Sequence, residues 1–346
     1  MDAGCYTAII TPFTSPATAV DYEGLERLVA FQISNGITGI LAVGTTGESP
    51  TLAWDEHHKV TQVIAEQTRA KCLCIAGTGS NNTKEALAAT EHAVTSGADA
   101  VLMVDPYYNG PSSLEIRNEY IAPVARAFPD VTIIPYVIPG RTGAQLFPQD
   151  LAILFNEFKN VNTVKEATAN LDNMKQTREC CGPDYTILSG DDGMTFDMMT
   201  DPKIHAAGVI SVVTNIAPKA VSEMVRLLNE GNISAAEQVK NAIAPLFGLV
   251  TVTTKEKTPY GEVTCRARNP LAIKTLMAIL GMPSGNCRQP LGKMSKTGLN
   301  KVLDVARRVQ QNNTEIFQPV ADFFDIDIEE RLTNDAHTEG LCYQSY

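Results

Sequence analysis

The stretch Val161-Asn-Thr-Val-Lys-Glu-Ala-Thr168 shows the pattern that decides the fold of this chain. Its β-branched residues favour a short buried strand over 163–165, and a loop should follow that strand. Lys165 stands at this junction with an apolar strand behind it. Burial disfavours the charged form of an amine and lowers its pKa, so Lys165 is a candidate nucleophile. On this stretch alone, a lysine that pairs with Glu166 or reaches to water is the simpler alternative.

The same unit recurs along the first two thirds of the chain. We expect eight strands, at Tyr6–Ile10, Gly39–Val43, Cys72–Ala76, Ala100–Val104, Thr132–Tyr136, Thr163–Lys165, Thr186–Leu188 and Gly208–Val212. Their spacing of roughly 22 to 33 residues is the length of a strand–loop–helix–loop unit. Eight such units predict an α/β fold, a (β/α)8 TIM barrel whose functional residues lie at the carboxyl ends of the strands. A doubly wound sheet is the alternative, but Thr11-Pro-Phe-Thr14 is unlike its glycine-rich phosphate loop.

Helical periodicity fills the gaps between these strands and continues beyond them. We expect helices at Asp21–Asn35, Trp54–Ala70, Thr83–Ser96, Ile116–Ala127, Lys219–Asn229, Ile233–Leu246, Asn269–Leu280 and Ser295–Gln311. A polar segment at 255–265 is interpreted as a turn-rich insert between two of these helices. The acidic stretch from 312 onward either packs as an extra helix or hangs loose, and both alternatives stay open. The predicted division is a barrel at 1–225, a C-terminal helical domain at 226–311 and an acidic extension at 312–346.

Composition excludes several classes of function. The net charge of −11, without any block of lysine or arginine, argues against a nucleic-acid partner. No apolar stretch approaches the roughly 18 residues that a membrane span requires. The N-terminus shows no signal-peptide pattern. The eight cysteines lack metal-ligand spacing, and small buried thiols in a reducing compartment are the favoured interpretation. We therefore expect a soluble, cytoplasmic protein without a metal.

The residues that follow the predicted strands form an informative set. The segments are Gly44-Thr-Thr-Gly-Glu-Ser49, Pro106-Tyr-Tyr-Asn109, Tyr136-Val-Ile-Pro-Gly-Arg-Thr-Gly143, Lys165-Glu-Ala-Thr168 and Ser189-Gly-Asp-Asp192. In a barrel, one mouth would collect a lysine, tyrosines, two threonines and an arginine. An amine can attack a ketone, a phenol can move protons, and threonines and an arginine can hold carboxylates. Each segment alone has a simpler interpretation: a helix cap at Ser49, packing of Tyr107 and Tyr108, or a surface ion pair of Arg141.

In this order, the motifs closely resemble the dihydrodipicolinate synthase family of pyruvate-dependent class I aldolases, which also includes N-acetylneuraminate lyase. The resemblance covers roughly residues 4 to 310. It implies that Lys165 forms an imine with pyruvate and that Tyr136 is the acid–base group above it. Thr45 and Tyr108 would complete a proton relay. In this family the tyrosine that matches Tyr108 usually comes from a neighbouring subunit, so the resemblance implies a dimer at least, and a homotetramer as the expected assembly.

The resemblance also implies the substrates. Thr46 would bind the carboxylate of pyruvate, with Gly190 and the backbone of Ile210 nearby. Arg141 would hold the carboxylate of L-aspartate-4-semialdehyde, and the product would be 4-hydroxy-tetrahydrodipicolinate, on the route to diaminopimelate and lysine. The sialic-acid lyases lack that arginine, because their acceptor is a sugar. No cofactor would be needed beyond the covalent imine. Two alternatives stay open: a pyruvate-dependent lyase acting on a sugar acid, and a non-catalytic barrel that binds a small molecule.

A second site follows from the same resemblance. In synthases that lysine inhibits, an interface cavity binds L-lysine through residues that match Ser49, Trp54, His57, Asn81, Glu85 and Tyr107. An aromatic face can hold the aliphatic stem and the ammonium group of lysine, and Glu85 offers a counter-charge. The resemblance therefore implies allosteric feedback inhibition, and the adjacent positions of Tyr107 and Tyr108 would couple it to catalysis.

The chain departs from the family pattern in four places. Val137 stands where the family commonly has asparagine, and Ala169 replaces a usual glycine. The insert at 255–265 and the tail after 312 exceed the usual length. Val137 puts local hydrogen bonding at the end of the fifth strand in doubt, and the insert and tail make the tetramer geometry less certain.

Overall fold

The computed structural model describes all residues 1–346, and it confirms the predicted (β/α)8 barrel. The eight parallel strands close in sequence order, and β1 pairs with β8 through Gly4 and Gly208. Their bounds are β1 Gly4–Ala8, β2 Gly39–Ala42, β3 Leu73–Gly77, β4 Ala100–Val104, β5 Thr132–Val137, β6 Thr163–Glu166, β7 Thr186–Ser189 and β8 Gly208–Ser211. Most strands lie within one residue of the prediction. The first begins two residues earlier than expected, because Gly4 and Cys5 are held by the register with β8.

Helices surround this barrel, and α1, α2, α3 and α10 lie close to predicted ranges. They are α1 Tyr22–Ser34, α2 Trp54–Thr68, α3 Thr83–Ser96, α4 Ser113–Glu115, α5 Ala122–Ala127, α6 Pro139–Thr142, α7 Pro148–Glu157, α8 Leu171–Cys181, α9 Thr195–Thr200 and α10 Pro218–Asn229. A π-helix, η2 (Ile116–Ile121), joins α4 to α5 and forms the first half of the helix predicted at 116–127. The elements η1 (Ser49–Thr51) and η3 (Val213–Asn215) are short 3-10 turns. Side-chain caps begin several of these helices, for example Asn82 at α3, whose oxygen accepts from the Lys84 amide. The predicted boundary at residue 225 falls within α10.

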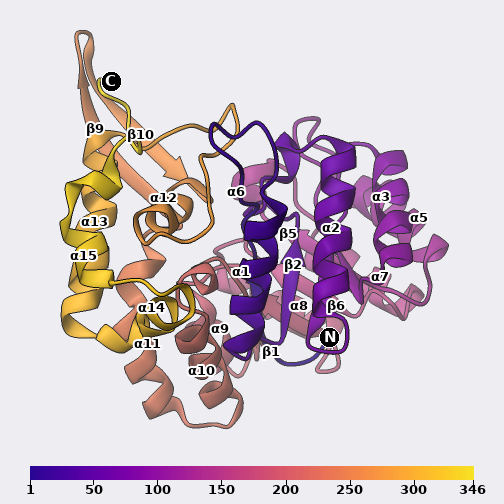
Figure 1. Cartoon of the computed structure of the whole chain (residues 1–346). Helices are drawn as coiled ribbons and strands as arrows, with labels where there is room; N and C mark the ends of the chain where they lie inside the picture. The colour runs from indigo at the N-terminus through magenta and orange to yellow at the C-terminus, as the bar shows by residue number, and fades with distance from the viewer.

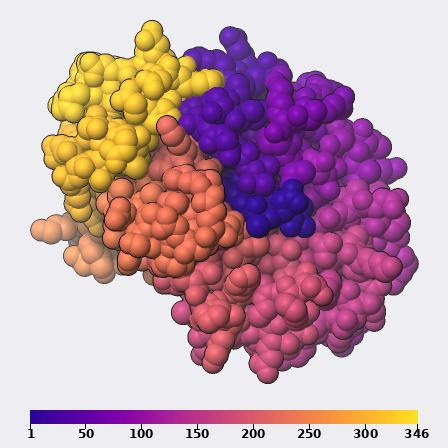
Figure 2. Space-filling model, turned by 90° about the horizontal axis from the view of Figure 1, so that it is seen from below, coloured from indigo at the N-terminus to yellow at the C-terminus, as the bar shows by residue number.

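The remaining elements lie to one side of the barrel (Figure 1; Figure 2). They are α11 Ile233–Phe247, β9 Thr251–Thr258, β10 Gly261–Arg268, α12 Leu271–Ile279, α13 Lys296–Asn312, η4 Thr314–Ile316, α14 Gln318–Phe324, α15 Ile328–Thr333 and η5 Asp335–Thr338. The tail therefore packs instead of hanging loose. Phe317, Val320, Phe324 and Leu332 bury their apolar side chains against the rest of the chain.

The predicted turn-rich insert at 255–265 is wrong. These residues belong to an antiparallel hairpin of β9 and β10, with Thr258 paired to Gly261 across a tight turn. The hairpin projects from the molecule in Figure 1, and Tyr260 at its tip is 99% exposed. Alternation explains the structure, because Val252 and Thr254 face the molecule while Thr253 and Lys255 face outward. The polar composition concealed this period of two.

Two apolar layers hold the barrel. The larger layer fills the space between strands and helices, and the smaller one fills the barrel interior. The interior residues are Tyr6, Ala8, Leu41, Ile75, Ala100, Leu102, Ile134, Tyr136, Leu188 and Ile210. Val137 points into the outer layer, where it is fully buried. The valine that replaces the family's asparagine thus packs among apolar side chains, away from the barrel interior.

No helix is long and apolar enough to cross a membrane. All eight cysteines are unpaired, but only Cys5, Cys74, Cys181 and Cys287 are buried. Cys180 is exposed, so the expectation of buried thiols is wrong for this residue. No three His, Cys, Asp or Glu side chains are grouped so that they could hold a metal ion.

Candidate active site

Lys165 lies on β6 and is buried, with 5% of its surface exposed. Its backbone is in direct register with Tyr136 on β5, and its Nζ lies 4.2 Å from the centre of the Tyr136 ring. Burial lowers the pKa of Lys165 from 10.5 to about 7; Asp192 opposes this change and Arg141 reinforces it. No ion pair involves this lysine, so the alternative of pairing with Glu166 is excluded. A large fraction of Lys165 is therefore a neutral amine at pH 7.

Gly190 makes room for this amine. A Cβ atom at Gly190 would lie 3.1 Å from Lys165 Cε and 2.9 Å from the Cβ of Ala167. Both distances are shorter than ordinary van der Waals contacts. A side chain at Gly190 would therefore displace the lysine or the strand end that carries it.

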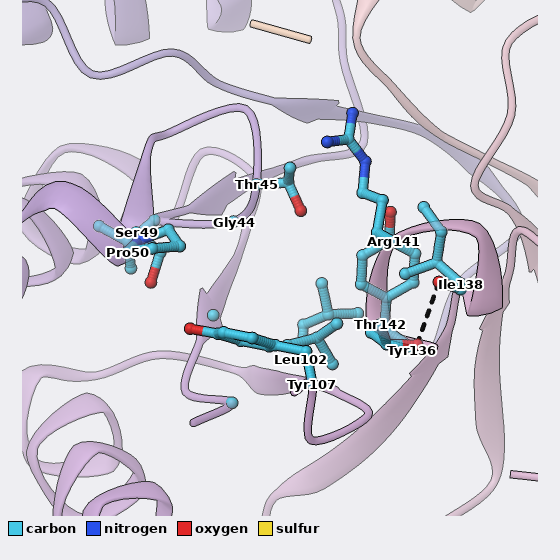
Figure 3. Close-up of a pocket in the computed structure, with 14 residues that line it drawn as sticks. Gly44, Thr45, Ser49, Pro50, Leu102, Tyr107, Tyr136, Ile138, Arg141 and Thr142 are labelled. Carbon is cyan, nitrogen blue, oxygen red and sulfur yellow. Dashed lines mark hydrogen bonds between the residues drawn. The ribbon is translucent and has the colours of Figure 1, made fainter. Parts of the chain in front are cut away.

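Tyr136 supplies a protonated phenol beside Lys165. Burial raises its pKa to about 12, and the Arg141 guanidinium and the Thr45 hydroxyl oppose this rise. At neutral pH the phenol therefore keeps its proton and can donate it. Thr45, Tyr136 and Arg141 line one cavity of about 220 Å³ at the carboxyl ends of the strands, as Figure 3 shows. Lys165 does not line this cavity and lies against the Tyr136 ring instead.

Thr46 is buried and receives a hydrogen bond from Asn269. The Asn269 Nδ2 donates to Thr46 Oγ1 over 2.9 Å. Because its oxygen accepts there, the Thr46 hydroxyl keeps its own proton for a second partner, such as a carboxylate. Ile210 on β8 lies in the apolar interior together with Tyr136.

The two adjacent tyrosines are placed differently. Tyr107 is half-buried and lines the cavity. Tyr108 is 94% exposed, has a φ of 85°, and does not line the cavity. Within one chain, the structure therefore does not bring Tyr108 to Lys165 and Tyr136.

The residues expected to bind lysine form two groups. Asn81 Oδ1 accepts from the Tyr107 amide over 2.7 Å. Burial raises the pKa of Tyr107, and the negative charge of Glu85 raises it further. Ser49 lines the same cavity as Tyr107. The second group is on α2, where Trp54 is 41% exposed and its ring centre lies 5.0 Å from that of His57. The His57 ring is buried, which lowers its pKa to about 4 and keeps it neutral.

Several residues of this site were not predicted from the sequence. Asp192 is buried, and its carboxylate accepts from Ser211 Oγ and from the Val212 amide at the end of β8. Burial raises its pKa to about 6. The Ser189-Gly-Asp-Asp192 motif marked this position but gave it no role. Asn269 follows the hairpin, and no motif connected it with Thr46.

The barrel and the buried lysine beside a tyrosine at its strand ends define a lyase of the class I aldolase type. A family model described as the dihydrodipicolinate synthetase family matches residues 1–309. The chain belongs to this family.

The individual relatives agree with this membership. The chain is 39% identical over 299 residues to a 4-hydroxy-tetrahydrodipicolinate synthase of Methanococcus maripaludis (strain S2), covering 86% of this chain and 96% of that one. A synthase structure from the methanotroph Methylacidiphilum fumariolicum SolV has a TM-score of 0.82 and 34% identity, with 92% of this chain and 99% of that one covered. A synthase structure from Cyanidioschyzon merolae with lysine bound has a TM-score of 0.80 and 30% identity, with 89% and 98% covered.

Proposed function

We propose that this protein is a 4-hydroxy-tetrahydrodipicolinate synthase, which condenses pyruvate with L-aspartate-4-semialdehyde in lysine and diaminopimelate biosynthesis. The relatives of similar length carry this name. The observation that carries the proposal is the buried amine of Lys165, without an ion-pair partner and 4.2 Å from the Tyr136 ring. Such an amine can attack the keto carbon of a keto acid and form an imine.

The proposed reaction begins at Lys165. Its neutral amine attacks the keto carbon of pyruvate, and protons must reach the departing oxygen so that it leaves as water. Tyr136 holds a proton at neutral pH, and its phenol interacts with the Thr45 hydroxyl through a hydrogen bond. This pair can therefore carry those proton transfers. Loss of a methyl proton converts the imine into an enamine, which adds to the aldehyde. The amino group of the second substrate then attacks the imine carbon, closes the ring and releases Lys165. No cofactor enters these steps.

Binding of the two carboxylates is assigned to two different residues, Thr46 and Arg141. Thr46 has a free hydroxyl proton for the carboxylate of pyruvate, and Gly190 and the backbone of Ile210 border Lys165 in this proposal. Arg141 lines the cavity and would hold the carboxylate of the semialdehyde. A fixed cation favours a short anionic aldehyde over a neutral polyol, which argues against the sugar-acid alternative.

Tyr108 would complete the proton relay from a second subunit. Its side chain is 94% exposed, and its left-handed backbone conformation is costly for a residue with a Cβ atom. A partner chain that receives this phenol would explain both features. We therefore propose that the active form is at least a dimer, with a homotetramer as the expected assembly.

Feedback inhibition by L-lysine is a further part of the proposal. Tyr107, Asn81 and Glu85 lie together beside the cavity, which supports a site for an amino acid. Trp54 offers an exposed aromatic face for the lysine stem.

The eight unpaired cysteines support a reducing, cytoplasmic location.

Trapping with borohydride tests the central assignment. The protein is incubated with pyruvate, reduced, digested and examined by peptide mass. We expect one adduct, on the peptide that contains Lys165, and none in Lys165→Ala. Lys219→Ala is the matched control, because Lys219 is an exposed lysine that does not line the cavity. An adduct that survives Lys165→Ala would contradict the proposal.

A coupled assay with L-aspartate-4-semialdehyde tests the substrate, with and without L-lysine. Turnover that requires Arg141 supports the synthase. Turnover with a polyol aldehyde that tolerates Arg141→Ala would identify a sugar-acid lyase instead. Lysine binding without any turnover of pyruvate would identify a non-catalytic barrel.

A further inference from the structure

A buried ion pair connects the C-terminal region to the loop that follows β2. Lys274 on α12 donates from Nζ to Glu48 Oε1 over 2.6 Å, and the two side chains are 1% and 0% exposed. Lys274 also donates to the carbonyl of Thr11 over 3.0 Å. The second oxygen of Glu48 accepts from the Arg288 amide over 2.9 Å. Each oxygen of this carboxylate therefore has a donor from a distant part of the chain.

Glu48 belongs to the segment Gly44–Ser49, which carries the two threonines of the site. Its φ of 58° lies in the left-handed region, which is unfavourable for a residue with a Cβ atom. Such a conformation persists only when its surroundings hold it. The preceding carbonyl, that of Gly47, accepts from Thr11 Oγ1 over 2.7 Å. The conformation of the threonine loop, residues 44–49, thus depends on contacts from outside the loop.

The C-terminal region holds this loop at a second point. Asn269 donates to Thr46, as described above, and the adjacent Arg268 donates from Nη1 to the Gly140 carbonyl over 3.2 Å. Gly140 is the neighbour of Arg141, the cation of the cavity. The segment from 268 to 274 therefore touches both sides of the candidate site without lining its cavity.

We propose that Lys274 is a positioning residue for the reaction. Through Glu48 it fixes the threonine loop, so that Thr45 stays beside the Tyr136 hydroxyl and Thr46 keeps its hydroxyl aimed at the keto acid. This inference rests on the proposed function and deepens it. On this view the segment from 268 to 274 positions the site, although none of its residues lines the cavity.

A purely stabilising role would explain the pair poorly. Two charges lose their hydration when they are buried, and a well-packed apolar pair commonly stabilises a fold as well or better. An apolar pair would supply no hydrogen bonds at these positions. The Glu48 carboxylate accepts from both Lys274 and the Arg288 amide, and these two bonds fix its orientation. The geometry that this pair imposes on the loop explains why the pair is polar.

The test uses Lys274→Met, Glu48→Gln and the double variant of the full-length chain. Each single variant removes one charge, and the double variant leaves no unpaired charge. We expect the KM for pyruvate to rise and kcat to fall, each by about 10-fold, because small displacements of positioning groups cost rate in this range. We expect the double variant to recover much of the lost thermal stability but not the kinetic constants. Lys274→Arg, which keeps the cation, should recover part of both constants.

Arg331→Met is the matched control. Arg331 donates to the carbonyls of Ile279 and Ala278 at the end of α12, so its loss weakens the same region without touching the loop. It should lower the melting temperature and leave KM and kcat unchanged. Wild-type constants in the double variant, measured well below its melting temperature, would overturn the proposal. Should a single variant fail to fold, the double variant decides the question by itself.

Failure of the underlying function would look different. A wild-type protein that forms no adduct with pyruvate would contradict the proposed reaction. A wild-type adduct, together with unchanged constants in all Lys274 and Glu48 variants, would contradict only the positioning role.

Discussion

Replacement of Lys165 by methionine should stabilise the fold at neutral pH. Burial lowers the pKa of this lysine from 10.5 in its ordinary state to about 7 in the folded chain. Between these two pH values the unfolded chain binds a proton that the folded chain lacks. The free energy of unfolding of the wild type therefore rises with pH across this window. A methionine of similar length fills the site without this dependence.

The magnitude follows from the two pKa values. Each pKa unit corresponds to about 1.36 kcal/mol, so the buried lysine costs the folded state about 4 kcal/mol at pH 7. The cost approaches zero as the pH rises through 10.5, where the unfolded chain also loses the proton. We expect Lys165→Met to be more stable than the wild type near neutral pH, and the difference to close toward pH 10.5.

Thermal and urea unfolding, followed by circular dichroism at a series of pH values, measure this difference. All samples need the same protein concentration, because association also changes apparent stability. Lys219→Met is the control, since Lys219 is exposed and its replacement should change stability little at any pH. A stability difference that does not vary with pH, or a wild type as stable as Lys165→Met at pH 7, would refute the burial argument.

Three further predictions concern the carboxyl ends of β6 and β7. Gly190→Ala should lower kcat/KM by about 10- to 100-fold through displacement of Lys165, and single-turnover adduct formation measures this loss. Asp192→Asn removes a carboxylate that raises the pKa of Lys165, so the pH midpoint of adduct formation should move downward; an upward movement would contradict it. Ala169 has a φ of 56°, and Ala169→Gly should raise the free energy of unfolding by about 0.5–1 kcal/mol, because the relief of left-handed strain exceeds the added chain entropy. Urea unfolding checks this last value, and a loss of stability would count against it.

The barrel could be predicted because the residues of each strand and helix carry the pattern of that element locally. A β-branched run such as Thr163–Lys165 signals a strand from its own residues, and so does the amphipathic pattern of α3 (Thr83–Ser96) for a helix. The hairpin of β9 and β10 carries the same kind of signal in a weaker form. Its inward residues include Thr254 and Glu256, so polar side chains occupy positions where apolar ones would have revealed the period. Its pairing depends on the register between two strands, which local composition does not encode.

The strand-end set of the site was predictable for a related reason. In a barrel, all carboxyl ends of the strands meet at one mouth, so Thr45, Tyr136, Arg141 and Lys165 converge once the fold is given. Asn269 and Lys274 come from beyond the last strand. Their contacts with the threonine loop depend on how the C-terminal region docks, and this docking follows no repeat that a single sequence displays.

Two buried lysines show how the fold separates reactivity from structure. Lys274 Nζ donates to Glu48 over 2.6 Å and to two backbone carbonyls, those of Thr11 and Asn286. Three oxygens therefore accept hydrogen bonds from this amine. Lys165 meets an aromatic ring, and the carboxylate that acts on it most, that of Asp192, is already committed to Ser211 and Val212. The first environment stabilises an ammonium group and the second favours a free amine. The same side chain, buried in both places, is therefore an anchor in one and a nucleophile in the other. A carboxylate placed next to Lys165 should raise the pKa of its amine and slow the formation of the pyruvate adduct at neutral pH.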